Sequence, residues 1–260
     1  GVDINEILEQ ILSSSEILEY KTIDALKNDI IIRANKVLFT YETLNFEFSH
    51  GTLDIEKSNF WIPLKPRDGA ESKTIWGLKD GVSPFNAVRE LNSSNVKVEC
   101  GAGIQIVELL AIAKTLGQKT FDEKFTDIVV SFNDIQSTDN RTGGMYNFQK
   151  SGRPSRNISK IEDLIIGDLV YFENYPDYKE KCSDGSWMGE NAIYQGNKMF
   201  WGHGVGEISE SDIIDLLKNQ YIKEVLKGNK SELKTIKTKE TTNGEYPGLS
   251  KEVFGIPSFY

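Results

Sequence analysis

The spacing of apolar residues predicts helices near both ends of the chain. Residues 3–29 repeat isoleucine and leucine at helical spacing, which predicts one or two packing helices. Residues 209–221 predict another helix, in which Ser209 and Asp212 form a capping pair. The sequence therefore predicts helices near both ends of the chain, on either side of the region from residue 30 to residue 208.

The region between the two ends combines short apolar segments with one short helix. Residues 29–39, 44–50 and 59–64 are apolar segments broken by polar turns, and they predict a strand-rich region. Residues 83–92 predict a short helix with a proline in its first turn. Residues 164–172 predict a turn that leads into a buried strand.

The longest apolar pattern begins at a cysteine. Residues 100–116 carry apolar side chains on several sides, which predicts a buried helix that starts at Cys100 and ends at Gly117. Residues 133–160 are rich in Asn, Ser, Gly and Arg and predict a long exposed loop, and residues 226–247 predict a tail that wraps the surface.

Together these patterns predict an α+β protein of a single domain over residues 1–260. We expect residues 1–54 to be a helical and strand-containing elaboration and residues 55–210 to be the core. Residues 211–260 would supply the C-terminal helix and tail.

Composition and charge exclude several classes of protein. The chain has 30 Lys and Arg against 39 Asp and Glu, a net charge of -9, which argues against nucleic-acid binding because phosphate contacts need clustered basic residues. No apolar run predicts a membrane span, and acidic residues interrupt any signal-peptide pattern at the start. Two cysteines and two histidines predict neither a disulfide scaffold nor a metal site, so we expect free thiols.

Residues 189–206, "GENAIYQGNKMFWGHGVG", predict a hairpin that pairs an acid with a histidine. If Gly196 and Asn197 form a two-residue loop, opposed positions sum to 393 and Glu190 faces His203. Directly opposed side chains project from one face, close enough for a carboxylate to orient an imidazole. The alternative is that His203 is a satisfied core histidine, because acid–histidine pairs also serve as structural links.

Cys100 is the candidate nucleophile. Amides at a helix N-terminus stabilise a thiolate, and Gly101 and Gly103 would let a substrate backbone approach the sulfur. The alternative is an inert buried cysteine. Cys182 lies in a polar loop and is read as exposed and incidental, and His50 is a lesser candidate for the base.

Four motifs carry a resemblance to a known family. The order of a cysteine helix, "GDLVYF" and a histidine strand resembles papain-like cysteine enzymes of the NlpC type. More closely, "VEC" at 98–100, "GDLVYFEN" at 167–174, Trp187 to Asn191 and "WGHGVG" at 201–206 resemble the small bacterial transglutaminases of spore-forming bacteria. The resemblance covers roughly residues 55–210.

The resemblance implies a calcium-independent protein-glutamine γ-glutamyltransferase without a cofactor. Its papain-like core would place the catalytic cysteine at the start of a buried helix, packed on an antiparallel sheet that carries the histidine. By this resemblance the catalytic residues are Cys100, Glu190 and His203, and Glu99 shapes the site entrance. Its partners would be proteins that offer glutamine donors and lysine acceptors. The setting would be the bacterial cytoplasm or the spore coat, or else a secreted effector.

Several alternatives remain open from the sequence. Either His203 or Glu190 is the working base. Residues proposed to contact substrate or line an acceptor channel include an amide and several aromatic side chains: Asn191, Trp187, Trp201, Phe200 and Tyr194. A glutamine deamidase or cysteine peptidase would share the acyl-enzyme but finish with water, and a non-catalytic coat or binding module is the third possibility.

Overall fold

A computed structural model describes residues 2–14, 20–42, 44–50, 53–67, 69, 75–131, 136–141, 156–233 and 241–254. Its helices are α1 (Ile4–Leu12), α2 (Ile23–Tyr41), α3 (Pro84–Glu90), α4 (Cys100–Lys124), α6 (Tyr178–Lys181) and α7 (Glu210–Glu224). Two short 3₁₀ helices, η1 (Ile161–Asp163) and η2 (Lys230–Glu232), join them. Most of the predicted 133–160 loop lies outside the described residues.

The strands form several small sheets and one larger, mainly antiparallel one. The larger sheet has the order β11-β10-β9-β8-β12, from β11 (Gly206–Ser209), β10 (Met199–Gly202), β9 (Gly189–Gly196), β8 (Leu169–Glu173) and β12 (Gly248–Leu249). A second sheet has the order β1-β5-β2, from β1 (Glu47–Phe48), β5 (Val96–Val98) and β2 (Leu53–Ile55). The others are β3 (Trp61–Leu64), β4 (Ile75–Leu78) and β6 (Val129–Ser131), and the pair β7 (Arg156–Asn157) with β13 (Glu252–Val253).

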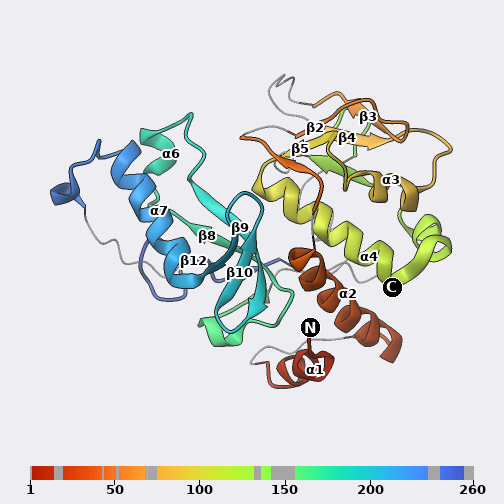
Figure 1. Cartoon of the computed structure of the whole chain (residues 1–260), viewed down its shortest axis with the longest axis horizontal. Coiled ribbons are helices and arrows are strands. Elements are labelled where there is room, and N and C mark those ends of the chain that lie inside the picture. Colours follow the sequence, from red (N-terminus) through yellow and green to blue (C-terminus); the bar gives the residue numbers. More distant parts are fainter. Residues whose placement is uncertain are drawn as a thin grey trace.

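Helix α4 lies at the centre of the molecule, between the larger sheet and the smaller ones (Figure 1). Its residues Ile104, Ile106, Val107 and Ile112 are fully buried, which agrees with the predicted helix apolar on several sides. Gly117 has φ 74° and ψ 167°, so the regular helix is broken there, and a further helical segment follows. The predicted end of the buried helix is therefore a kink.

Within the described residues, α4 is the one helix long and apolar enough to cross a membrane by length and composition. This corrects the expectation that no such run exists. Most of its apolar window is buried between the other elements of the fold, as in a core helix.

Helix α2 corrects the strand prediction for residues 29–39. The β-branched run there favours a strand locally, but Asp29, Arg33 and Lys36 recur at helical spacing and each finds a buried partner. Arg33 lies 3.3 Å from Asp29 one turn earlier, and Lys36 Nζ lies 2.7 Å from Glu108 of α4. Tertiary pairing thus overrides the local strand preference.

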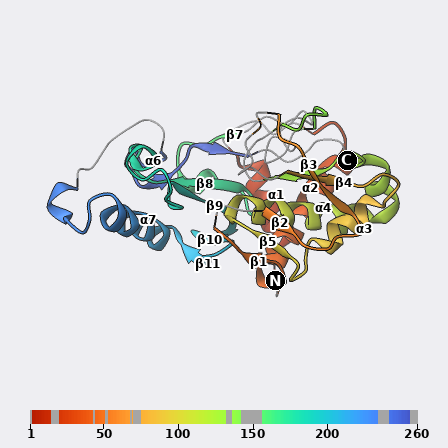
Figure 2. The ribbon, with the colours of Figure 1, turned by 90° about the horizontal axis from the view of Figure 1, so that it is seen from above.

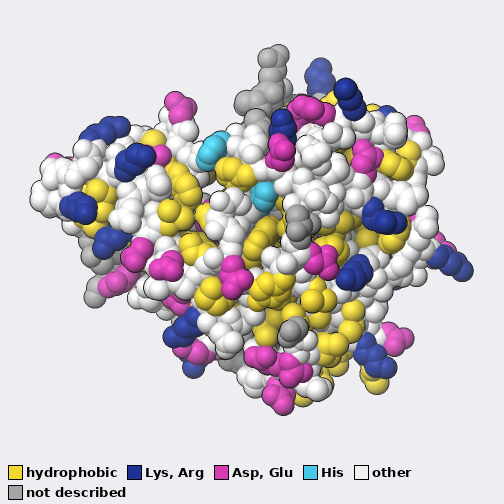
Figure 3. All heavy atoms as spheres, viewed as in Figure 1, with side chains coloured by type: hydrophobic (Ala, Val, Ile, Leu, Met, Phe, Trp, Pro, Cys, Tyr) yellow, Lys and Arg dark blue, Asp and Glu magenta, His cyan; other side chains and the backbone are white. Residues whose placement is uncertain are grey.

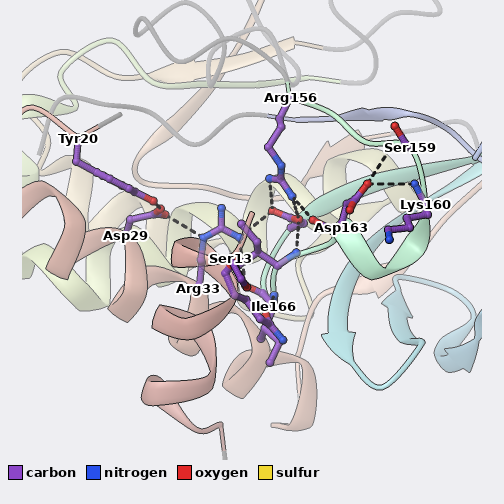
Figure 4. A network of polar contacts seen from close by, with 12 residues as sticks. Ser13, Tyr20, Asp29, Arg33, Arg156, Ser159, Lys160, Asp163 and Ile166 are labelled. Atoms are coloured by element: carbon purple, nitrogen blue, oxygen red, sulfur yellow. Dashed lines mark hydrogen bonds and ion pairs between the residues drawn. The ribbon is translucent and has the colours of Figure 1, made fainter. Parts of the chain in front are cut away.

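A buried ion network ties α2 to the start of β8 (Figure 4). Asp168 accepts from Arg33 Nη1 at 2.8 Å and from Arg156 Nη2 at 2.6 Å, and its Oδ2 also accepts from the Ile165 backbone N–H. Burial acts to raise the pKa of Asp168, but the two arginines hold it well below its usual range. The network fixes the strand that leads toward the site.

The predicted helices at 83–92 and 209–221 are confirmed as α3 and α7, and Ser209 caps α7 by accepting from the Asp212 N–H. The last described segment returns to the larger sheet, where β12 pairs with β8 (Figure 2). On the face in Figure 3, hydrophobic side chains show through the middle, while acidic and basic side chains alternate around the periphery.

Candidate functional site

Cys100 is the first residue of α4 and directly follows β5 and the N-cap residue Glu99. The Glu99 carboxylate accepts hydrogen bonds of 2.6 Å from the backbone N–H groups of Gly101 and Ala102. We had expected these amides to stabilise the thiolate of Cys100. Because a carboxylate already occupies them, they offer little to a second anion, and this part of the sequence argument is wrong.

The thiol of Cys100 is held among polar groups of β9. The Asn191 side-chain Nδ2 lies 3.6 Å from the Cys100 Sγ, and the Asn191 backbone N–H also points to it. Burial raises the pKa of the Cys100 thiol well above its usual value, and the charges of Glu190 and Glu99 raise it further. The resting sulfur is therefore a neutral thiol, and a base must remove its proton.

Glu190 supplies a carboxylate to this thiol. It is 5 % exposed, and the Cys100 side chain lies close enough to influence its pKa. Burial, followed by the charge of Glu99, raises the pKa of Glu190 to about 8. Among the described residues its Oε1 has no hydrogen-bond partner, and a Cβ on Gly202 would come within 2.9 Å of that atom. A base with a pKa near neutrality and a free oxygen is suited to proton transfer.

The observed hairpin differs from the predicted one by one residue. Its loop is Asn197–Lys198, both with positive φ, so Met199 pairs with Gly196. A bulge then shifts the register, and Trp201 pairs with Ile193. Glu190 lies beyond the paired part of the hairpin and is not directly opposite His203.

The His203 imidazole packs against α4 and aromatic residues. A Cβ on Gly103 would lie 2.6 to 2.8 Å from His203 atoms, so this glycine makes room for the histidine instead of for a substrate backbone. The ring lies 4.7 Å from the Phe46 ring and 5.5 Å from the Phe48 ring. Burial lowers the pKa of His203, although backbone carbonyls of neighbouring strands oppose this, and its Nε2 has no hydrogen-bond partner in the described part of the chain. A neutral imidazole results.

The other predicted residues lie at various distances from this cluster. Tyr194 and Phe200 pair across the hairpin in the hydrophobic core, while Trp187 is partly buried and Trp201 lies 6.2 Å from the His203 ring. Their role in an acceptor channel stays a prediction. Both cysteines are free, as expected, but Cys182 is half-buried beside a tyrosine cluster and is not fully exposed. His50 is exposed, and its ring contacts Phe48.

Tyr171 is a further residue of the site that was not predicted from the sequence. It lies directly opposite Asn191 in the β8–β9 ladder, and its ring covers Gly189, where a Cβ would clash with it. Burial raises the pKa of Tyr171, and the charge of Glu173 raises it further. The signal was available in "GDLVYFEN", because strand alternation places Tyr171 and Glu173 on one face.

A cavity of about 940 Å³ lies away from this cluster, where the turn before α3 meets the end of α4. It is lined by polar residues such as Asp122 and Arg141, and the described residues of its lining include neither a cysteine nor a histidine, so chemistry places the candidate site at Cys100. Within the described residues, no group of three or more His, Cys, Asp or Glu side chains is placed to hold a metal ion.

Known proteins match both the sequence and the fold. The model of the family "Protein-glutamine gamma-glutamyltransferase" matches residues 3–243. The chain is 27 % identical to the protein-glutamine gamma-glutamyltransferase of Bacillus mycoides, over 84 % of this chain and 71 % of the relative. It is 24 % identical to that of Bacillus pumilus, over 82 % of this chain and 78 % of the relative.

A solved structure shares the fold. The transglutaminase from Geobacillus stearothermophilus, without its C-terminal extension, aligns with a TM-score of 0.59 at 19 % identity and covers 90 % of this chain and 94 % of its own. Because the family match spans most of the chain, the protein belongs to the protein-glutamine gamma-glutamyltransferase family and is a bacterial transglutaminase of the Bacillus type, which acts on glutamine and lysine side chains of proteins.

Proposed function

We propose that Cys100 is the nucleophile of this transglutaminase and that Glu190 is its working base. The observation that carries the proposal is the proximity of the buried Glu190 and Cys100 side chains, each of which influences the pKa of the other, in a site that raises the pKa of both groups. A nucleophile and a base in hydrogen-bond reach are the geometric requirement for nucleophilic catalysis. The cysteine at the start of a core helix, packed on an antiparallel sheet, supports a papain-like arrangement of this site.

We assign His203 a positioning role. Its ring packs against Gly103 and Phe46, burial lowers its pKa, and the carboxyl group whose pKa responds to the thiol is that of Glu190. The imidazole would keep α4 and the end of β10 in register and leave the proton transfer to the carboxylate. This separates the two candidates for the base that the sequence left open.

Asn191 would complete the oxyanion site. Glu99 already accepts from the amides of Gly101 and Ala102, which leaves the Cys100 backbone N–H as one donor. The Asn191 side-chain amide, 3.6 Å from Sγ, is the second. Donors placed beside the sulfur stabilise the negative oxygen that develops when the thiol attacks a carboxamide carbon.

The reaction then follows in two halves. Cys100 Sγ attacks the Cδ of a substrate glutamine as Glu190 takes the thiol proton, and the tetrahedral intermediate expels ammonia, which receives that proton. In the second half Glu190 takes a proton from a lysine amine, and the amine nitrogen attacks the carbonyl carbon of the thioester. Collapse forms the isopeptide bond and releases the Cys100 thiolate, which regains a proton from Glu190.

The test is incorporation of a labelled primary amine into a glutamine donor peptide. We expect Cys100→Ala to abolish incorporation and Cys182→Ala, at the other free thiol, to retain it. Ammonia release without incorporation would mean that water resolves the thioester. Incorporation that persists in Cys100→Ala would overturn the assignment of the nucleophile.

A further inference from the structure

A small cavity opens beside β8 and α6, on the face of the larger sheet from which the side chains of Tyr171 and Asn191 project. Its volume is about 200 Å³, and three of its walls are the buried rings of Tyr175, Tyr178 and Tyr246. Met188, which is 42 % exposed, lies at its rim. Because a water molecule takes up roughly 30 Å³, the cavity has room for one long side chain.

One face of the β8–β9 ladder connects this cavity to Cys100. Tyr171 and Glu173 both line the cavity and, two positions apart on β8, project from the same face. Tyr171 lies opposite Asn191, whose amide reaches the Cys100 Sγ at 3.6 Å. Tyr171 therefore lies at the border between the cavity and the reacting sulfur.

The charges at this border favour a cation. Glu173 lines the cavity, and burial together with the charge of Glu173 raises the pKa of Tyr171, which keeps its phenol neutral. The one basic residue of the lining, Lys179, is exposed. Tyrosine ring faces attract ammonium groups, and a carboxylate adds to that attraction. A glutamine carboxamide is neutral and gains nothing from such a field.

We propose that this cavity is the docking subsite of the acceptor lysine. The aliphatic stem lies against the tyrosine rings and the ammonium lies beside Glu173 and Tyr171, from where it passes to the thioester. The proposal rests on the proposed role of Cys100 as the nucleophile, because the amine reacts with the thioester that forms on Cys100. The neutral donor glutamine would reach Cys100 by a route other than this cavity.

Charge substitutions at Met188 test the subsite, because this exposed side chain lies at the rim and tolerates replacement. The quantity to measure is the ratio of kcat/KM for a lysine peptide to kcat/KM for hydroxylamine, a small amine that carries no charge near neutral pH. We expect the ratio to fall about threefold in Met188→Lys and to rise about threefold in Met188→Glu, with Met188→Gln between them. Glu173→Gln should also lower it.

The matched control is Glu180→Lys, at an exposed position of α6 outside the cavity, which should leave the ratio unchanged. Equal ratios in all three Met188 variants, with both amines still incorporated, would overturn the subsite but leave the proposed nucleophile intact. A change in KM for the glutamine peptide in place of the lysine peptide would likewise overturn it. Failure of the nucleophile assignment looks different, because hydroxylamine incorporation would then persist in Cys100→Ala.

Discussion

The Glu190 carboxylate interacts with the Cys100 thiol from a strand position that the hairpin register does not place opposite His203. In the proposed mechanism the acid and the cysteine form the functional couple, and the histidine, which follows β10, supports it by packing against α4. Because the raised pKa keeps the thiol in its neutral form, the proposed mechanism requires proton transfer to Glu190 to accompany the attack on substrate.

The pH dependence of the enzyme should report Glu190. Burial, followed by the charge of Glu99, raises the pKa of this carboxyl from 4.5 to about 8. Below that pH the carboxyl is protonated and cannot accept the thiol proton, so kcat/KM should rise with pH through an inflection near 8. Glu190→Asp, which keeps the acid but changes its reach, should shift this inflection. An inflection below about pH 6 in the wild-type enzyme would contradict the assignment.

Removing the charge of Glu99 should make Cys100 more reactive toward a simple alkylating agent. The Glu99 carboxylate caps α4 and also raises the pKa of the thiol. In a Cys182→Ser background, we expect Glu99→Gln to speed alkylation by iodoacetamide at pH 7 by about threefold or more. Glu207→Gln, at an exposed position, is the matched control. Slower alkylation in Glu99→Gln would show that the carboxylate cap assists the thiolate, and it would contradict this account.

The buried pair Lys36 and Glu108 predicts a non-additive effect on stability. Both side chains are fully buried, and burial lowers the pKa of Lys36 and raises that of Glu108. Lys36→Met leaves an unpaired buried acid and should cost about 3–5 kcal/mol, whereas Lys36→Met with Glu108→Leu should recover most of that loss. Urea unfolding of the two single variants and the double variant measures this. A double variant as unstable as the sum of the singles would rule out the coupling.

Local signals predicted some elements well and others poorly. The helix at Cys100 and the cap at Ser209 depend on nearby residues, so spacing and capping rules located them. Residues 29–39 form a helix whose Arg33 and Lys36 pair with Asp168 and Glu108. These two acids lie far away in the sequence, so rules based on neighbouring residues do not include them. The β-branched run was therefore mistaken for a strand.

The candidate site shows the same division. Residue type and motif identified Cys100 and Glu190 as site residues. The position of the Glu190 side chain relative to Cys100 was not predicted. The hairpin loop lies at Asn197–Lys198, one residue later than predicted, and this loop together with the bulge between Met199 and Phe200 changed the register expected for Glu190. The Glu99 carboxylate accepts hydrogen bonds from the helix amides that were predicted to stabilise the thiolate. Tyr171 was missed because its importance comes from a neighbour on another strand, Asn191.

The most direct test of the account is the rate at which Cys100 is acylated without any acceptor amine. The enzyme is mixed with a glutamine donor peptide, quenched in acid, and the thioester is followed by mass spectrometry in the wild type, Glu190→Gln and His203→Asn. If Glu190 is the base, Glu190→Gln should acylate about 100-fold more slowly or worse, while His203→Asn should lose less than about tenfold. Near-normal acylation in Glu190→Gln, together with a severe loss in His203→Asn, would contradict the account.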